Sequence, residues 1–204
     1  MSMPVVTYGC TACNLRCSDV GRWGYRYYLY GELKVRMRVA IGWCHTCADL
    51  GVIEVLPDAT GELELQRTLE AYQAELSEMF ANDPPRKRWW QLSAIKSTTH
   101  SNLEYYTESA AEALAEYQLA REALSSRESR GRCLRCGSDD CLQLPPHEAK
   151  YYDPEPVPEP IGLEHPGCSG QLTIFCDDLR LSMRIIEKIY DLEGLLVDET
   201  DPDV

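Results

Sequence analysis

The chain has 204 residues, of which 44% are hydrophobic, and it carries a net charge of −13 at pH 7. This length suits one domain or two small ones, and so acidic a chain is not expected to coat nucleic acid, although one local basic contact stays possible. No apolar run reaches the roughly 20 residues of a membrane helix and no signal peptide is recognisable, which predicts a cytoplasmic protein without a membrane segment.

The first features along the chain are two Cys-x-x-Cys pairs, Cys10 with Cys13 and Cys44 with Cys47. In a reducing compartment, clustered cysteines indicate metal ligands rather than disulfides. Each pair turns two thiolates to one side of a tight loop, and two such loops side by side complete a tetrahedral shell. We therefore expect these four residues to bind one zinc ion.

The segment between the two pairs has the pattern of a β-hairpin. Residues 22–30 and 33–39 are rich in aromatic and β-branched side chains, and Gly31-Glu32 suits a two-residue turn. A third strand is expected in residues 51–56. Two cysteine pairs with strands between them resemble the zinc-ribbon family, and this resemblance implies that residues 1–57 form one zinc ribbon.

Residues 58–128 are predicted to form a helical hairpin. Two apolar stripes at helical spacing, in residues 61–80 and 101–124, indicate amphipathic helices that pack antiparallel. The first stripe consists of Leu65, Leu69, Tyr72, Leu76 and Met79, and the second, with a seven-residue period, of Leu103, Tyr106, Ala110, Ala113, Tyr117, Ala120 and Leu124. Their connector, residues 84–100, contains four Lys/Arg and no Asp/Glu. Cations beside aromatic rings there could contact nucleic acid, or they could neutralise the acidic helices while the rings fill the core. The basic and aromatic residues concerned are Arg86, Lys87, Arg88, Trp89 and Trp90.

A second metal-ligating set follows the helices and looks like an internal repeat. Cys133 and Cys136 form a third pair, and His165 with Cys168 forms a fourth at the same spacing. A Cys₃His shell suits zinc, so a second structural zinc ion is expected here. Cys141 or Cys176 is the alternative fourth ligand in place of His165. The predicted boundaries are 129–199 for this second ribbon, 145–160 for a proline-rich insertion and 200–204 for an acidic tail.

The predicted hairpin also defines a candidate binding surface. Pairing across Gly31-Glu32 places cations beside aromatic and apolar side chains on one face, because successive residues of a strand point to opposite sides. Such a face suits nucleic acid or an acidic protein surface, and it could also cover the chain's own acidic helices. The residues are Tyr25, Tyr27 and Leu29 opposite Arg38, Arg36 and Lys34.

The sequence thus predicts an α+β protein in which two zinc ribbons flank an antiparallel helical hairpin. No phosphate-binding loop or nucleophile motif occurs, and two closed zinc sites leave no position for a substrate, so we do not expect an enzyme. The predicted function is an interaction module or adaptor with a protein partner, and the alternative is a nucleic-acid-binding regulator. Iron in the site of Cys10, Cys13, Cys44 and Cys47 is a third possibility, although the Cys-Pro step typical of rubredoxin-like proteins is missing.

Overall fold

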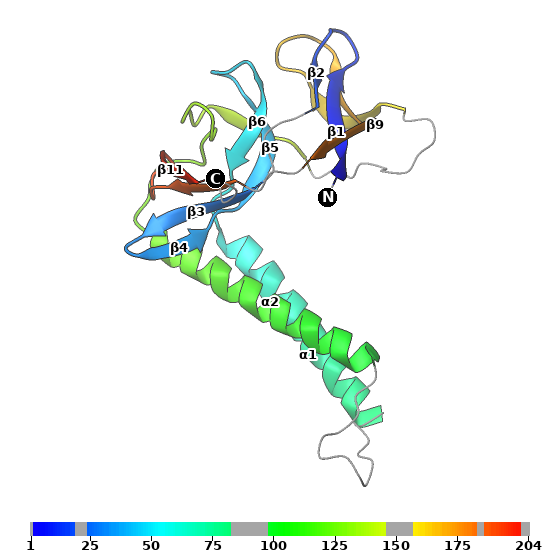
Figure 1. Cartoon of the computed structure of the whole chain (residues 1–204), viewed down its shortest axis with the longest axis vertical. Helices are drawn as coiled ribbons and strands as arrows, with labels where there is room; N and C mark the ends of the chain where they lie inside the picture. Colours follow the sequence, from blue (N-terminus) through cyan, green and yellow to red (C-terminus); the bar gives the residue numbers. More distant parts are fainter. Residues whose placement is uncertain (1, 19–23, 83–97, 146–156, 183–185, 201–204) are drawn as a thin grey trace. The chain divides into compact units, whose positions relative to one another are not determined.

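The computed structural model describes residues 2–18, 24–82, 98–145, 157–182 and 186–200. Over these residues the fold is α+β, with one pair of helices and three small sheets (Figure 1). The chain forms two compact units. The β unit combines Met1–Leu56 with Ser126–Val204, and the helical unit is Pro57–Ser125.

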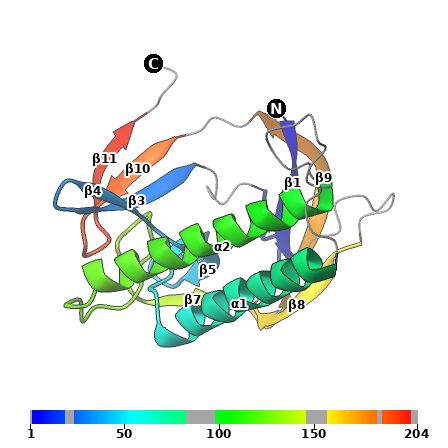
Figure 2. The ribbon, with the colours of Figure 1, turned by 90° about the horizontal axis from the view of Figure 1, so that it is seen from below.

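The helical unit is an antiparallel pair, α1 (Ala59–Asn82) and α2 (Thr98–Ala123), as Figure 2 shows. The Tyr117 hydroxyl near the end of α2 donates to the Asp58 carbonyl oxygen just before α1, and Tyr72 stacks on Tyr106 farther along the pair. The Asp58 carboxylate caps α1 by accepting a 2.7 Å hydrogen bond from the backbone N–H of Gly61. The predicted helical hairpin is therefore present.

The predicted apolar stripe agrees with the observed burial more closely in α1 than in α2. The predicted stripe of α1 is half-buried throughout. On the stripe predicted for α2, Tyr106 and Ala113 are exposed. The other positions follow the prediction, being buried at Leu103, Tyr117, Ala120 and Leu124 and half-buried at Ala110. The basic connector predicted at residues 84–100 lies largely outside the described residues.

The first sheet joins strands from both ends of the chain. Its order is β2-β1-β9-β8, with antiparallel neighbours. Cys10 is the register partner of Leu172, because the end of β1 lies beside the start of β9. This pairing places the turn after β1 next to the turn before β9. The strands are β1 (Ser2–Cys10), β2 (Arg16–Cys17), β8 (Glu159–Glu164) and β9 (Gln171–Ser182).

The second sheet, β6-β5-β7, is also assembled across the helical hairpin. Strand β5 pairs antiparallel with both neighbours, so Cys44 lies opposite Asp49 on one side and opposite Cys141 on the other. An isolated β-bridge between Ile53 and Cys133 holds the segment before β7 against β6. Its strands are β5 (Val39–Cys44), β6 (Asp49–Glu54) and β7 (Cys141–Gln143).

The predicted hairpin forms part of a third sheet, β11-β10-β3-β4, in which β10 runs parallel to β3. The turn is at Gly31-Glu32 as predicted, with a φ of +62° at Gly31. The hairpin was expected to lie within a zinc ribbon, and that expectation is wrong, since its second neighbour is β10 rather than a strand that carries a cysteine pair. The strands are β3 (Tyr25–Tyr30), β4 (Leu33–Arg36), β10 (Glu187–Tyr190) and β11 (Leu196–Thr200).

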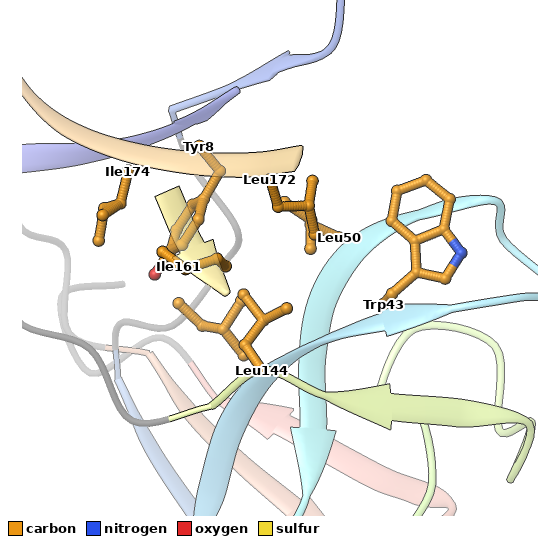
Figure 3. Packing of buried hydrophobic residues seen from close by; sticks show 8 residues of the cluster. Tyr8, Trp43, Leu50, Leu144, Ile161, Leu172 and Ile174 are labelled. Carbon is orange, nitrogen blue, oxygen red and sulfur yellow. The ribbon is translucent and has the colours of Figure 1, made fainter. Parts of the chain in front are cut away.

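The hydrophobic core of the β unit lies between the first two sheets. Figure 3 shows apolar side chains from both sheets gathered at this junction. Burial of one Leu or Ile side chain stabilises a fold by roughly 1.5–3 kcal/mol, so this shared cluster holds the two sheets together. The cluster comprises Tyr8, Ile161, Leu172 and Ile174 from the first sheet, and Ile41, Trp43, Leu50 and Leu144 from β5, β6 and the residue after β7.

A buried ion pair connects the second and third sheets. Arg127 binds Glu54 at the end of β6 through two hydrogen bonds of 2.6 and 2.7 Å, and their side chains are 2% and 0% exposed. The Tyr28 hydroxyl of β3 donates to the same carboxylate at 2.6 Å, as does the backbone N–H of Arg132 at 3.0 Å. Burial, followed by the charge of Glu54, raises the pKa of Tyr28 far above its ordinary value.

No helix in the described part of the chain is long and apolar enough to cross a membrane.

Candidate metal centres

The structure brings four side chains of the first sheet together, which we call the Cys₃His cluster: Cys10, Cys13, His165 and Cys168. Their ligand atoms all lie within 4.8 Å of one another. Cys10 is the last residue of β1 and Cys13 lies in the turn between β1 and β2, whereas His165 and Cys168 lie in the turn between β8 and β9. The two turns meet because β1 and β9 pair at that end.

The second sheet holds a Cys₄ cluster of Cys44, Cys47, Cys133 and Cys136, with the same limit of 4.8 Å between ligand atoms. Cys44 is the last residue of β5 and Cys47 lies in the turn between β5 and β6, whereas Cys133 and Cys136 lie in the loop that leads into β7. The hydrogen bond from the backbone N–H of Leu134 to the Val52 carbonyl oxygen, 3.0 Å long, holds this loop against β6.

The distances between ligand atoms match the edges of a tetrahedron. The Sγ atoms are 3.4 Å apart for Cys10 and Cys168, and 3.6 Å apart for Cys44 and Cys136. A metal with bonds of about 2.3 Å to tetrahedral thiolates separates the sulfurs by about 3.8 Å, whereas a disulfide needs about 2.05 Å. The Nδ1 atom of His165 lies 3.1 Å from the Sγ atom of Cys168. Each cluster could therefore hold one metal ion.

Backbone N–H groups point at the sulfurs of both clusters. The N–H of Ala12 donates to Cys10 at 3.4 Å, and the N–H of Cys47 donates to Cys44 at 3.5 Å. Burial opposes ionisation of the Cys10 thiol, but hydrogen bonds from Ala12 and Cys168 lower its pKa to about 6. Burial likewise opposes ionisation of Cys44, and hydrogen bonds led by the one from Cys47 lower its pKa to about 7. Each cluster thus contains one cysteine prepared to bind a metal as the thiolate.

Two backbone features show how closely the chain approaches these clusters. The residue after the second cysteine has a left-handed backbone in both turns of the Cys₄ cluster, with φ of +50° at Ala48 and +76° at Gly137. At Gly170, an added Cβ would lie 2.5 Å from the Sγ atom of Cys10. Glycine is therefore required at position 170 by the cluster itself.

All eight side chains predicted as ligands lie in the two clusters, but their predicted pairing is wrong. Cys10 and Cys13 were expected to share an ion with Cys44 and Cys47. The structure instead combines the first pair with the fourth and the second with the third, so that one centre is nested inside the other in sequence. The two centres are consequently not tandem copies. Strand pairing between β1 and β9, and between β5 and β7, produces this arrangement.

The alternatives to His165 as a ligand do not match the geometry. Cys141 lies opposite Cys44, beside the other cluster, and its thiol points to the Ser138 carbonyl oxygen at 3.4 Å. Burial and the neighbouring Cys44 raise the pKa of Cys141 to about 12, so it remains a protonated thiol there. Cys176 is buried in β9, and burial raises its pKa as well.

A ring contact joins the two centres and could not be found from the cysteine spacing. Trp43, which precedes Cys44 in β5, packs edge-on against the ring of His165, with 4.6 Å between ring centroids. Both side chains are buried. The orientation of His165 in the Cys₃His cluster therefore depends on the strand that carries the other cluster.

Comparisons with known proteins do not add a family or a relative to this description. A scan of protein-family models, a search of curated proteins and a search of solved structures each returned no match for this chain.

Proposed function

We propose that the protein is a non-enzymatic interaction module, stabilised by two structural zinc ions, that binds a protein partner through the outer face of β3 and β4. Cys₄ and Cys₃His are the ligand sets of structural zinc sites, and four protein ligands leave no coordination position for a substrate. Zinc would supply folding free energy to two small sheets that have little core of their own.

The observation that carries the proposal is the outer face of β3 and β4. The pairing Tyr27–Arg36 and Leu29–Lys34 follows the predicted register, and the same face includes Tyr25. Tyr25 is 43% exposed and Leu29 40% exposed, and the Arg36 guanidinium lies 5.7 Å from the centre of the Tyr25 ring. Tyrosine and arginine are the residues most often enriched at the energetic centre of protein interfaces.

The neighbouring strands favour a protein over a nucleic acid as the partner. In register, Glu187 of β10 lies next to Tyr25, and Ile189 and Asp198 continue the row of Tyr27. Glu187 also forms an ion pair with Lys34. An aromatic and apolar centre bordered by charges of both signs is typical of protein interfaces, whereas a phosphate backbone selects for cations alone.

The same face has a hollow in which a partner side chain could be seated. A cavity of about 320 Å³ is lined by Tyr25, Arg36 and Arg38 of this face, and also by the buried Arg26 and Met37. The exposed cations at this hollow suit an acidic side chain of the partner. The net charge of −13 would repel a polyanion such as DNA more strongly than it would repel a protein with one acidic patch.

The test is affinity capture from nuclease-treated extract of the native host, followed by reconstitution with the purified partner. The double variant Tyr25→Ala/Arg36→Ala should lose the captured protein, because both side chains lie on the proposed face. Tyr105→Ala is the matched control, since this tyrosine is exposed on α2. Equal capture by all three proteins would contradict the proposed surface.

A binding titration with single- and double-stranded nucleic acids at physiological salt separates the alternative. Non-specific binding has a dissociation constant of roughly 1–100 µM, so we expect nothing tighter than about 1 µM. Tighter binding that disappears in Arg36→Glu would replace the protein partner with a nucleic acid. The other basic segment, residues 86–90, lies outside the described residues, and the same titration tests whether it binds nucleic acid.

A further inference from the structure

A further cysteine of the second sheet lies beside the Cys₄ cluster without belonging to its ligand set. Cys141 is the first residue of β7, and the register of β5 with β7 makes it the direct partner of Cys44, the last residue of β5. Opposite residues of an antiparallel pair carry their side chains on the same face of the sheet. A non-ligand thiol therefore lies next to a metal-ligating one.

The hydrogen bonds on either side show which kind of pair these two cysteines form. Antiparallel strands alternate between hydrogen-bonded and non-hydrogen-bonded pairs of opposite residues. The N–H of Leu144 donates to the Ile41 carbonyl oxygen at 3.0 Å, and the N–H of His45 donates to the Asp140 carbonyl oxygen at 3.0 Å. In the register of β5 and β7, each bond joins opposite residues that lie an odd number of positions from the two cysteines. The two cysteines thus form a non-hydrogen-bonded pair.

A non-hydrogen-bonded pair has the spacing of a disulfide. Its Cα atoms are about 4.5 Å apart, which is the closer of the two spacings between opposite residues. A disulfide joins Cα atoms that are about 4.4–6.8 Å apart. The N–H of Cys141 donates to the Asp139 carbonyl oxygen at 2.9 Å and not to β5, as expected for such a pair. The two strands can therefore carry a bond between Cys44 and Cys141 without a change of register.

The Cys₄ cluster also exposes one sulfur to an oxidant in solution. Cys136 is exposed, whereas Cys141 is half-buried and Cys44 is fully buried. The Sγ atoms of Cys136 and Cys44 are 3.6 Å apart. Thiol–disulfide exchange proceeds by attack of a thiolate on a disulfide sulfur. A small disulfide can therefore react first at Cys136, and the oxidation can then pass to the buried Cys44.

We propose that Cys44 and Cys141 form a redox-active dithiol, which a small disulfide such as oxidised glutathione converts into a cross-strand disulfide with loss of the metal from the Cys₄ cluster. Only three of the four ligands then remain as thiolates. Zinc in a structural site requires four deprotonated or neutral ligands, so its affinity for this cluster falls. The Cys₃His cluster keeps all of its ligands. This inference goes beyond the proposed function and needs no partner.

The conversion takes place in three exchanges. The Cys136 thiolate attacks the small disulfide, whose S–S bond breaks; a mixed disulfide forms, and one small thiol leaves with a proton from water. Cys44 attacks the Cys136 sulfur, and the second small thiol leaves, again with a proton from water. Cys141 attacks the Cys44 sulfur, and Cys136 leaves with the proton of Cys141. Two electrons thus pass from Cys44 and Cys141 to the small disulfide, which is reduced to two thiols.

The experiment equilibrates the zinc-loaded full chain, without oxygen, in glutathione buffers of increasing oxidising strength that contain a weak zinc chelator. Elemental analysis of the desalted protein counts the retained ions, and mass spectrometry maps the disulfides after the free thiols are alkylated. Cleavage before Asp140 separates Cys136 from Cys141, and fragment ions distinguish Cys44 from Cys47. We expect wild type to pass from two ions to one as Cys44 becomes linked to Cys141, and to regain the second ion after reduction in the presence of zinc.

The variant Cys141→Ser should need a glutathione buffer at least about tenfold more oxidising for the same loss of zinc, because it lacks the thiol that completes the cross-strand bond. Cys176→Ser is the matched control and should behave as wild type, since Cys176 is also a non-ligand cysteine in a strand of the β unit. Cys141→Ala replaces Cys141→Ser if the reduced serine variant has lost an ion. The linkage mapped in wild type decides alone if both variants have lost one.

Three results would overturn the proposal: retention of both ions in the most oxidising buffer, a final linkage other than that of Cys44 with Cys141, or equal sensitivity of wild type and Cys141→Ser. Reduced wild type without zinc would instead contradict the zinc sites of the proposed function. The linkage mapped after oxidation would still test the pairing of the two cysteines in that case.

Discussion

At the scale of single residues, the stability of the β unit depends on a few buried side chains whose neighbours fix their conformation. Glu54 accepts hydrogen bonds from Tyr28, Arg127 and the backbone of Arg132, and Arg127 also donates to the Leu192 carbonyl oxygen. One buried carboxylate thus connects β3, β6 and the segments before β7 and β11. A buried ion pair adds little over an apolar pair, but loss of one partner leaves a costly unpaired charge.

We therefore predict that Arg127→Ala lowers the free energy of unfolding by about 3–5 kcal/mol. The matched control is Arg121→Ala, which removes an ion pair with Glu62 whose arginine side chain is 42% exposed, and should cost less than about 1 kcal/mol. Urea unfolding followed by fluorescence and circular dichroism measures both. A similar loss of unfolding free energy in the two variants would show that the hydrogen bonds around Glu54 are not critical for stability.

Gly170 provides a second prediction at this scale. Gly170→Ala places a methyl group against the Sγ atom of Cys10, and such overpacking typically costs about 1–3 kcal/mol. The affinity of the Cys₃His cluster for zinc should fall by about tenfold to hundredfold. Competition with a zinc chelator measures this loss. Gly51→Ala is the control, because nothing lies within 4 Å of an added Cβ at that position, and its zinc affinity should stay unchanged.

At the scale of elements, local sequence features account for the β3–β4 hairpin and for the start of α1. The Gly31-Glu32 turn sets the register of β3 and β4, and the pleat then separates Tyr25 and Tyr27 from the buried Tyr28. Helix α1 begins where the Asp58 carboxylate can accept a hydrogen bond from the first turn. The Tyr117 hydroxyl contacts the same carboxylate, which joins the cap to α2.

We predict that Asp58→Ala destabilises the helical unit by about 0.5–2 kcal/mol at neutral pH, whereas Asp58→Asn retains most of the cap. Hydrogen bonds, first that from the Gly61 backbone, lower the pKa of Asp58 below its ordinary 3.8. A lowered pKa contributes stability above the unfolded value, and this contribution is lost as the pH falls through the folded value. The difference between wild type and Asp58→Ala, measured by helical circular dichroism, should therefore shrink below about pH 3.8. A difference independent of pH would contradict this role.

At the scale of the whole molecule, each metal centre is built from both sides of the helical insertion. The Cys₃His cluster joins the end of β1 and the turn after it to the turn before β9, and the Cys₄ cluster joins the end of β5 and the turn after it to the loop before β7. The Trp43–His165 contact and the shared apolar core link the two centres within one β unit. Nested and tandem arrangements predict different metal contents for variants that lack two ligands, so the arrangement can be tested.

We predict that purified protein contains two zinc ions, and that double variants distinguish the two arrangements. Cys13→Ser/Cys168→Ser should lose one ion, because both ligands belong to the Cys₃His cluster, whereas Cys13→Ser/Cys47→Ser should lose both. Elemental analysis of the purified variants gives the counts. Tandem pairing requires the reverse result. The site first considered for iron, Cys10 and Cys13 with Cys44 and Cys47, does not form, so a red colour with iron in place of zinc would assign iron to the Cys₄ cluster of Cys44, Cys47, Cys133 and Cys136.

The non-ligand cysteines supply the companion control. Cys141→Ser should leave the zinc content at two, since its thiol lies beside the Cys₄ cluster without belonging to it. The same holds for Cys176→Ser in β9. Loss of an ion from either variant would mean that the ligand set is wrong.

The sequence by itself determined which side chains can ligate a metal, because two-residue spacing is a local property of a turn. It also determined the two helices and the register of the β3–β4 hairpin, which follow from apolar periodicity and from one glycine turn. Only the tertiary structure decided which of the four pairs come together in one cluster. All four pairs have nearly the same chemistry and spacing, so local sequence cannot distinguish their partners. The choice is made by the pairing of β1 with β9 and of β5 with β7, strands that are far apart in the chain and meet around a common core.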